Sequence, residues 1–434
     1  MENTLHNQLL AGEKLSFEKF REEVLKDYRM ACESRQASLL GRKEVLTGKA
    51  KFGIFGDGKE VAQIAAAKFF KPGDFLSGYY RDQTFAFATG QATIEEFFSQ
   101  LYADPDTTNE PHSGGRQMNS HFATPIVDEN GEWLDLVNRK NIAAGLAPTA
   151  GQMPPALGLA LASKLFRHSD VLKDLKHLSN NGNEVCFATI GDAATSEGHF
   201  WEALNAAAVM MAPLAVFVWD DGYGISVPTQ LQTVKGSISE AMKGMQKKDN
   251  TNGFDIYKVK AWDYAGMCEV FESAIQRIRE THIPALFHVE EVTQPQGHST
   301  SGSHERYKSP ERLAWEREWD SNKKMREWIL ENELASEEEL NDIELQAKEY
   351  VRSCKESAWQ KFIGPLQKMV NEAVELMDHL RNSGVGHEEE IERIIHALAT
   401  NREPHRRDIL SALHQVLLLV GDAPQSGDVR NYYE

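Results

Sequence analysis

Short apolar runs predict a strand, a helix and a second strand in the middle of the chain. Residues 185–190 and 214–218 are almost entirely apolar, as expected of buried strands. Between them, across residues 196–211, apolar side chains recur at steps of three and four, which predicts a helix with one buried face. Ser196 is the expected N-cap, and Pro213 ends the helix. We therefore predict a βαβ unit with two parallel strands.

Similar patterns before and after this unit predict a larger sheet covered by helices. Strand-like segments at residues 256–259 and 285–289 enclose a helical pattern at residues 266–281. Further helices are expected at residues 61–70 and, in an N-terminal arm, at residues 14–40. The alternation of strands and helices predicts the α/β class, with a parallel sheet flanked by helices.

Changes in composition divide the chain into three predicted parts. They are a helical N-terminal arm at residues 1–45, an α/β domain at residues 46–310 and a charged helical C-terminal region at residues 311–434. The last part contains charged helical patterns followed by the apolar run at residues 416–420. That combination is typical of a segment that faces a partner or another domain.

Acidic residues follow both central strands. Asp192 stands at the end of the first strand, and Asp220 and Asp221 stand at the end of the second. The carboxyl ends of parallel strands share one edge of the sheet, where ligands usually bind, and the helix that begins there favours an anion such as a diphosphate. Carboxylate oxygens suit Mg²⁺. The pattern thus predicts a diphosphate with its metal, the alternative being an ordinary βαβ turn whose acidic residues cap helices.

Composition limits the partners of the chain. A net charge of -18 argues against nucleic acid or an anionic membrane as the main partner, so an anionic cofactor must meet local positive charge. No apolar stretch is long enough to span a membrane, and we expect neither a membrane partner nor a signal peptide. The four cysteines are far apart, which favours reduced thiols and a cytoplasmic location; they are Cys32, Cys186, Cys268 and Cys354.

The run Gly191-Asp192-Ala193, with Asp221 further on, resembles a known signature. It is similar to the Gly-Asp-Gly and Asn-Asn of the thiamine-diphosphate motif in alpha subunits of 2-oxo acid dehydrogenase first components. The resemblance implies the thiamine-diphosphate-binding fold, with Mg²⁺ held by Asp192, Asp221 and the carbonyl of Tyr223. Ala193 replaces a glycine and Asp221 an asparagine. A carboxylate still offers an oxygen to the metal, and Ala193 fits if its φ stays negative.

A second Gly-Asp-Gly, at residues 56–58, is a rival for this motif. The residue as far from Asp57 as Asp221 is from Asp192 is Ala86, whose side chain has no oxygen. No convincing apolar strand precedes Asp57. We therefore predict a loop before the helix at residues 61–70.

Further cofactor contacts are implied by the resemblance. The Tyr80-Arg81 pair matches residues that bind the diphosphate in the family, and an arginine fork suits phosphate oxygens. By composition alone, Arg81 would be taken for a surface residue. The complete set of implied cofactor-binding residues is Tyr80, Arg81, Ala147, Thr149, Asp192, Ala193, Ala194, Asp221, Tyr223 and His298.

The polar loop at residues 294–303 is rich in small residues, which is typical of an active-site loop. The family has a His-Ser-Thr loop at this place, and the resemblance implies that His298 is catalytic and assists acyl transfer to a lipoyl group. An imidazole can give or take a proton near neutral pH. Without the resemblance, a single histidine in a loop would be taken for a surface residue.

The resemblance implies a function and a set of partners. The chain is expected to be the alpha component of a 2-oxo acid dehydrogenase complex, with thiamine diphosphate and Mg²⁺ as cofactors. A beta-type subunit or fused second half would complete the active site, and a lipoylated acyltransferase would accept the acyl group, giving a hetero-oligomer. Gly115-Arg116-Gln117-Met118 resembles branched-chain members. Arg116 and His121 either line the substrate side or fix a loop, and the structural role is favoured for both. The alternatives are an acetoin-type dehydrogenase subunit and a non-catalytic assembly subunit.

Overall fold

The computed structural model describes residues 16–300 and 302–434. The first described helix is α2 (Phe17–Leu46), and its N-cap is Ser16, whose side chain accepts a hydrogen bond from the Lys19 amide. Its face bearing Val24 and Tyr28 is buried. The predicted helical arm is therefore confirmed over these residues, and its residues 1–15 lie outside the described part of the chain.

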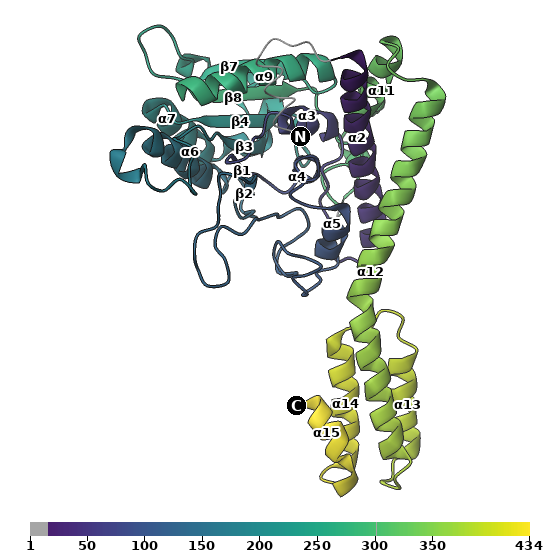
Figure 1. Ribbon diagram of the computed structural model, residues 1–434. Coiled ribbons are helices and arrows are strands. Elements are labelled where there is room, and N and C mark those ends of the chain that lie inside the picture. The colour runs from purple at the N-terminus through teal and green to yellow at the C-terminus, as the bar shows by residue number, and fades with distance from the viewer. Residues whose placement is uncertain (1–15, 301) are drawn as a thin grey trace. The chain divides into compact units, whose positions relative to one another are not determined.

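A six-stranded parallel sheet forms the centre of the fold (Figure 1), in the order β2-β1-β3-β4-β8-β7. The two predicted central strands are neighbours in it, which confirms the βαβ unit. The predicted α/β class is likewise confirmed. The strands are β1 (Phe75–Ser77), β2 (Asn141–Ile142), β3 (Cys186–Gly191), β4 (Leu214–Trp219), β7 (Asp255–Lys260) and β8 (Ala285–Glu290).

Side chains alternate between the two faces of this sheet along each strand, and helices cover both faces. One face carries a row of stacked rings: Phe217 lies 5.8 Å from Phe187 and 4.5 Å from Phe287 between ring centroids. Phe271, from a helix on that face, meets Phe217 edge to face at 5.2 Å. The opposite face packs small and aliphatic side chains against two other helices. Burial on both faces explains why β4 is apolar throughout.

The flanking helices agree with the sequence patterns, with one correction at a helix start. Ser196 was predicted to cap the central helix, and this is wrong: residues Ala193–Ser196 form a 3-10 turn, η2, and the N-cap is Glu197. The Ser196 hydroxyl instead contacts the carbonyl of Gln232 at 3.3 Å. The helices are α3 (Glu60–Ala67), α4 (Gln83–Ala88), α5 (Ile94–Leu101), α6 (Met153–His168), α7 (Gly198–Met210), α8 (Ile238–Ala241) and α9 (Tyr264–Thr281), and α6 and α7 pack together.

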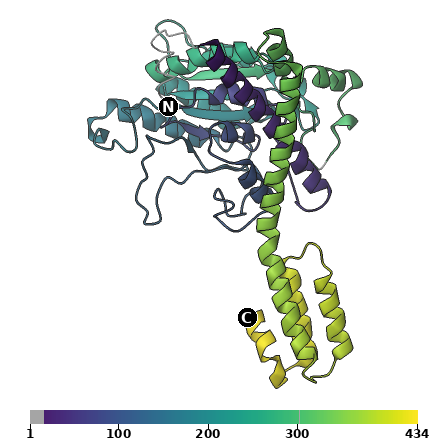
Figure 2. The same cartoon turned by 45° about the vertical axis from the view of Figure 1, so that its right-hand side comes forward.

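Contacts divide the chain into two units, Met1–Cys354 and Lys355–Glu434. In the first unit, α2 lies beside the beginning of α12 (Figure 1 and Figure 2), where Tyr28 donates to Glu344 at 2.6 Å. The boundaries predicted from composition, at residues 45 and 310, remain predictions. The helices that follow the sheet are α10 (Pro310–Glu318), α11 (Ser321–Glu331) and α12 (Glu337–Arg381), the last of which belongs to both units.

The second unit is a helical bundle with its own apolar core. It comprises the later part of α12 together with α13 (Glu388–Ala399), α14 (Arg406–Val420) and α15 (Gly427–Tyr433). Met377, Ile391 and Leu413 contribute fully buried side chains to this core. The helical patterns predicted in this region are confirmed.

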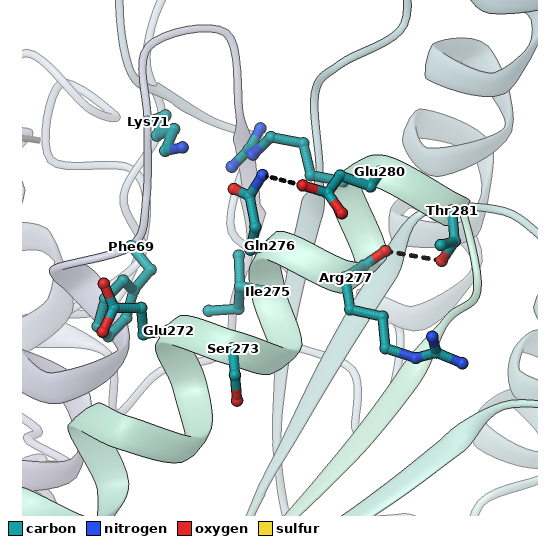
Figure 3. Close-up of a pocket in the computed structure, with 10 residues that line it drawn as sticks. Phe69, Lys71, Glu272, Ser273, Ile275, Gln276, Arg277, Glu280 and Thr281 are labelled. Carbon is teal, nitrogen blue, oxygen red and sulfur yellow. Dashed lines mark hydrogen bonds between the residues drawn. The ribbon is translucent and has the colours of Figure 1, made fainter. Parts of the chain in front are cut away.

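A surface pocket lies between α9 and the turn at Phe69 and Lys71 (Figure 3). The end of α9 that lines it precedes β8, so the pocket is at the amino edge of the sheet and away from the acidic residues that follow the strands. Two of its charged side chains are paired: Arg279 with Asp74 at 2.7 Å, and Glu280 with Gln276.

The sequence predicts reduced cysteines and no membrane-spanning segment. All four cysteines are free. Within residues 16–300 and 302–434, no helix has the length and apolar character needed to cross a membrane.

Candidate functional site

Two carboxylates meet where β3 and β4 end. The strands are in register, with Gly191 opposite Trp219, so Asp192 and the acidic pair after Trp219 emerge side by side. Asp192 is 4% exposed, accepts a hydrogen bond from the Thr229 hydroxyl at 2.8 Å, and forms no ion pair with any other described residue. Burial, and then the charges of Asp221 and Asp220, raise the pKa of Asp192 well above its ordinary value. The carboxyl edge therefore holds a buried acid without a cation.

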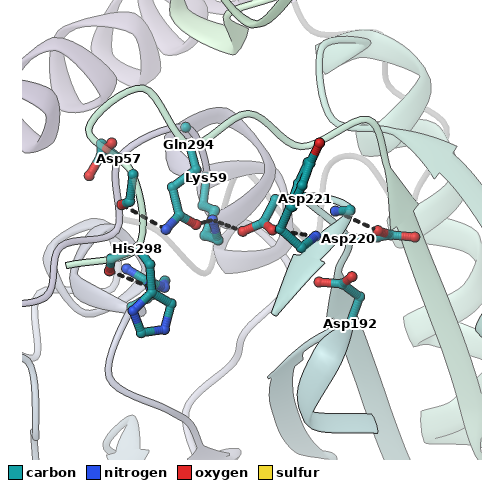
Figure 4. Close-up of polar contacts among 12 residues, drawn as sticks. Asp57, Lys59, Asp192, Asp220, Asp221, Gln294 and His298 are labelled. Atoms are coloured by element: carbon teal, nitrogen blue, oxygen red, sulfur yellow. Dashed lines mark hydrogen bonds and ion pairs between the residues drawn. The ribbon is translucent and has the colours of Figure 1, made fainter. Parts of the chain in front are cut away.

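Asp221 differs from Asp192 because it has a cationic partner (Figure 4). Its Oδ2 lies 3.3 Å from the ammonium of Lys59, and its Oδ1 accepts from the Tyr223 amide at 3.2 Å. Burial opposes ionisation of Asp221, but the charges of Lys59, Arg81 and Lys308 lower its pKa overall. Asp221 is thus held as a carboxylate by its surroundings.

A chain of hydrogen bonds orients the loop that carries Asp221. Asp220 Oδ2 contacts Nε2 of His288 at 2.8 Å, and Nδ1 of the same ring lies 2.8 Å from the hydroxyl of Ser239. The other carboxylate oxygen of Asp220 accepts from the Gly222 amide at 3.0 Å. Strand β8 therefore fixes the start of this loop through His288.

Tyr223 begins a short hairpin after the loop, formed by β5 (Tyr223–Gly224) and β6 (Val227–Pro228). The ammonium of Lys308 lies 5.2 Å from its ring centre and the guanidinium of Arg312 lies 5.5 Å away. Arg312 also donates to the Asp221 carbonyl at 2.7 Å. Two cations from the beginning of α10 and the residues before it therefore surround this loop.

Ala193 adopts the backbone conformation that its methyl group requires. It opens η2 and is not among the residues with positive φ. Its side chain packs against Gly224, where an added Cβ would lie 2.7 Å from the Ala193 Cβ. The methyl group at position 193 thus fits because position 224 has none.

Arg81 connects two of the loops around the site. Its guanidinium donates to the carbonyls of Phe55 and His298, each at 2.7 Å, and lies 5.2 Å from the ring centre of Tyr80. Burial first, and the charge of Arg81 second, lower the pKa of His298 to about 4. The imidazole is therefore neutral at neutral pH and next to the predicted diphosphate-binding pair.

Three other predicted cofactor contacts are less buried than Asp192. Ala147 and Thr149 are exposed, and Ala194 is half-buried in η2. Gln152, which closes the turn containing Thr149, donates to the Thr189 carbonyl at 2.8 Å. This bond holds the turn near the end of β3. The structure brings the other predicted residues together around Asp192 and Asp221.

Arg116 and His121, which were expected to be structural, lie in a loop before β2. Arg116 is exposed and donates to the Ser113 carbonyl at 3.2 Å. His121 is buried, and its Nδ1 lies 3.2 Å from the Met118 carbonyl. Both side chains contact their own loop.

Sequence reasoning missed Lys59 and the residues that hold it. Lys59 is 1% exposed, and its ammonium also donates to Gln294 at 2.9 Å. The loop before it is fixed by Asp57, whose carboxylate accepts from the Gln296 amide at 2.9 Å. One signal pointed to such a cation, namely the aspartate that replaces asparagine at position 221, because a buried carboxylate requires a partner.

The donors present here suit a magnesium diphosphate. Among the described residues, no group of three or more His, Cys, Asp or Glu side chains is placed to hold a metal. A site for Mg²⁺ would instead use two carboxylates and a backbone carbonyl, with oxygens supplied by the diphosphate. Asp192, a buried acid that has no ion pair with a described residue, fits such a cation, and Lys59 and Arg81 provide positive charge beside Asp221.

Fold and site together define a parallel α/β protein with acidic and cationic side chains gathered at the carboxyl edge of its sheet. The chain belongs to the dehydrogenase E1 component family, whose model matches residues 28–364. The resemblance inferred from the motifs is thereby confirmed.

Several curated relatives resemble this chain. The 2-oxoisovalerate dehydrogenase subunit alpha 1 of Arabidopsis thaliana is 26% identical over 335 residues, covering 76% of this chain and 61% of the relative. The corresponding alpha subunit of Bacillus subtilis is 30% identical over 215 residues, covering 49% and 56%. The pyruvate dehydrogenase E1 component subunit alpha of Rickettsia bellii is 28% identical over 205 residues, covering 47% and 56%. The matches thus span 56% to 61% of the lengths of these relatives.

Proposed function

We propose that this chain is the alpha, diphosphate-binding component of a thiamine-diphosphate-dependent 2-oxo acid dehydrogenase. The observation that carries the proposal is the pair Asp192 and Asp221 at the ends of neighbouring parallel strands, in a chain of the E1 component family. A scaffold without chemistry would have no need for a buried carboxylate such as Asp192 that lacks an ion pair within the described residues. The proposed activity is oxidative decarboxylation of a 2-oxo acid.

Each residue of the site receives a role in this proposal. Asp192, Asp221 and the Tyr223 carbonyl hold Mg²⁺, while Tyr80 and Arg81 bind the diphosphate. Arg81 retains N-H groups for phosphate oxygens beyond the two bonds that it makes to carbonyls. Thiamine diphosphate, when bound, supplies the electron sink for decarboxylation. The remaining proposed cofactor contacts are Ala147, Thr149, Ala193, Ala194 and His298.

His298 is the proposed catalytic residue of this chain. Its pKa of about 4 leaves the imidazole unprotonated at neutral pH, so that it can accept a proton or a hydrogen bond when the acyl group moves to a lipoyl group. Arg81 holds the backbone of this loop through the His298 carbonyl. The same arginine therefore positions the proposed diphosphate and the proposed base.

The proposed partners follow from the names of the relatives. These relatives are alpha subunits, and two of those described act in 2-oxoisovalerate dehydrogenases, which favours a branched-chain 2-oxo acid as substrate. A beta-type subunit would complete the active site, and a lipoylated acyltransferase would accept the acyl group. The assembly would be a hetero-oligomer.

The decisive experiment compares the chain alone with the chain purified together with its beta-type partner. Decarboxylation of branched-chain 2-oxo acids, in the presence of thiamine diphosphate and Mg²⁺, is expected only for the pair. Asp192→Ala in the pair should abolish Mg²⁺-dependent binding of thiamine diphosphate in calorimetry. Robust decarboxylation by the chain alone would contradict the shared site, and an unchanged affinity in the variant would refute the metal assignment. Turnover of acetoin in place of 2-oxo acids would favour the acetoin-type alternative.

A further inference from the structure

Lys59 is a buried lysine that two side chains hold at the candidate site. Its ammonium lies 3.3 Å from Asp221 Oδ2 and 2.9 Å from Gln294 Oε1 (Figure 4). Lysine is seldom fully buried without a partner, because loss of its hydration is costly. The burial of Lys59 therefore depends on the acceptors it meets, and Asp221 is the charged one.

The backbone just before Lys59 packs closely against a second loop. Gly58 has a φ of +85°, and a Cβ there would lie 1.9 Å from the Thr293 carbonyl oxygen, so only glycine allows the two loops to approach this closely. The Lys59 amide donates to the Gly56 carbonyl at 3.2 Å. Lys59 thus follows a closely packed turn at the start of α3, and its ammonium reaches Asp221.

Asp192 and Asp221 differ in their cationic neighbours. Asp192 has no ion pair with a described residue, whereas Asp221 has Lys59 within hydrogen-bonding distance. An aspartate at position 221 adds one negative charge relative to an asparagine, and Lys59 adds one positive charge beside it. The pair is therefore close to neutral, as an asparagine would be.

On the basis of the proposed function, we propose that Lys59 is a positioning residue of the cofactor site, which offsets the charge of Asp221 so that the two side chains act as one neutral unit. Asp221 then offers an oxygen to the metal without adding its full charge, and Asp192, which has no ion pair with a described residue, offers the second carboxylate oxygen. Lys59 acts through Asp221 and does not itself bind the diphosphate.

A double-mutant cycle on the full-length chain tests the pair without any cofactor. The variants are Lys59→Met, Asp221→Asn and the double variant, each unfolded in urea in the presence of EDTA. Each single variant should lower the unfolding midpoint, because it leaves a buried charge without its partner, and the double variant should recover most of the loss. Lys68→Met is the matched control, since Lys68 ends α3 and pairs with Asp27 outside the site at 2.7 Å. Strictly additive losses in the cycle would overturn the pairing.

The same variants, in the complex with the beta-type partner, test the effect of the pair on metal binding. Titration of Mg²⁺ at saturating thiamine diphosphate should show affinity about tenfold or more weaker in Asp221→Asn, where the ammonium repels the cation, and stronger in Lys59→Met. The double variant should return to within about threefold of the original affinity. Loss of thiamine diphosphate affinity in Lys59→Met that persists in the double variant would overturn the proposal in favour of a direct phosphate contact.

Failure of the two proposals would give different results. Coupling between Lys59 and Asp221 in the urea cycle, together with an original complex that binds no thiamine diphosphate, would refute the proposed function. The role of Lys59 in metal binding would be refuted with it. If the original complex binds thiamine diphosphate but the urea effects are additive, only the Lys59 proposal is overturned.

Discussion

Replacing Asp82 by asparagine should remove a pH dependence from the stability of this protein. Asp82 follows the Tyr80-Arg81 pair and is 2% exposed. Its carboxylate accepts hydrogen bonds from the Tyr79 amide at 2.9 Å, from the Gln63 side chain at 3.2 Å, and from the hydroxyl of Thr189 in β3. Asp82 thereby ties the proposed diphosphate-binding turn to the sheet.

Burial raises the pKa of Asp82 from an ordinary value of 3.8 to about 7, against hydrogen bonds that favour the charged form. The folded state then keeps a proton that the unfolded chain has released above about pH 4. The resulting stability is fully present at low pH and is lost as the pH rises through about 7. With about 1.4 kcal/mol for each pKa unit, the loss is at most about 4 kcal/mol.

The assay is urea unfolding of the original chain and of Asp82→Asn at several pH values between about 5 and 8. The free energy of unfolding of the original chain should fall relative to that of the variant, by up to about 3 kcal/mol across this range. Asp174→Asn, which alters an exposed acid before β3, is the control and should leave the slope unchanged. Parallel curves for the original chain and Asp82→Asn would refute the reasoning, because Asp82 would then titrate alike in both states.

Two further predictions concern the packing at Ala193 and the charge of His298. Gly224→Ala should lower the free energy of unfolding by about 1 to 3 kcal/mol, since the added Cβ would lie 2.5 Å from the Gln232 Oε1 and 2.7 Å from the Ala193 Cβ. Ala193→Gly in the same chain removes one of these two contacts and should restore part of the stability, and a double variant no more stable than Gly224→Ala alone would contradict this. The His298 imidazole should titrate near pH 4 in NMR spectra of the ligand-free chain, and a midpoint near its ordinary value of 6.5 would mean that it is solvated.

The sheet could be predicted from the sequence because its signals are local. Each predicted central strand is a continuous apolar run, and such a run results when both faces of a strand are buried, as for β4. The positions of Asp192 and Asp221 could be predicted from the same apolar runs, because parallel pairing places the carboxyl ends of both strands at one edge of the sheet. Short-range patterns thus sufficed for the fold and for the two carboxylates.

The start of the central helix was predicted wrongly for a physical reason. A serine shortly before an apolar helical pattern is a favoured N-cap, but here the chain first makes the 3-10 turn η2. The Ser196 hydroxyl contacts the Gln232 carbonyl, far along the chain. A tertiary contact of this kind leaves no mark in the local sequence.

Lys59 escaped prediction because its role depends on two distant segments. The Gly-Asp-Gly pattern at residues 56–58 predicts a loop, and nothing in that pattern distinguishes the lysine that follows it. Its partners, Asp221 and Gln294, follow other strands, so that only folding brings the three together. The aspartate at position 221 indicated that a cation was needed but not which one.

The distribution of positive charge bears on how a chain with a net charge of -18 would bind the proposed diphosphate. Cations from three separate segments converge on the loop after β4: Lys59 pairs with Asp221, Arg312 donates to its carbonyl, and Arg81 and Lys308 lower its pKa. Lys308 and Arg312 also share the buried Glu316, which fixes them in place. Lys59 is offset by Asp221, and Lys308 and Arg312 are offset by Glu316, whereas Arg81 has no ion pair with a described residue. Arg81 is therefore the cation of this group that would favour an anion at this edge of the sheet.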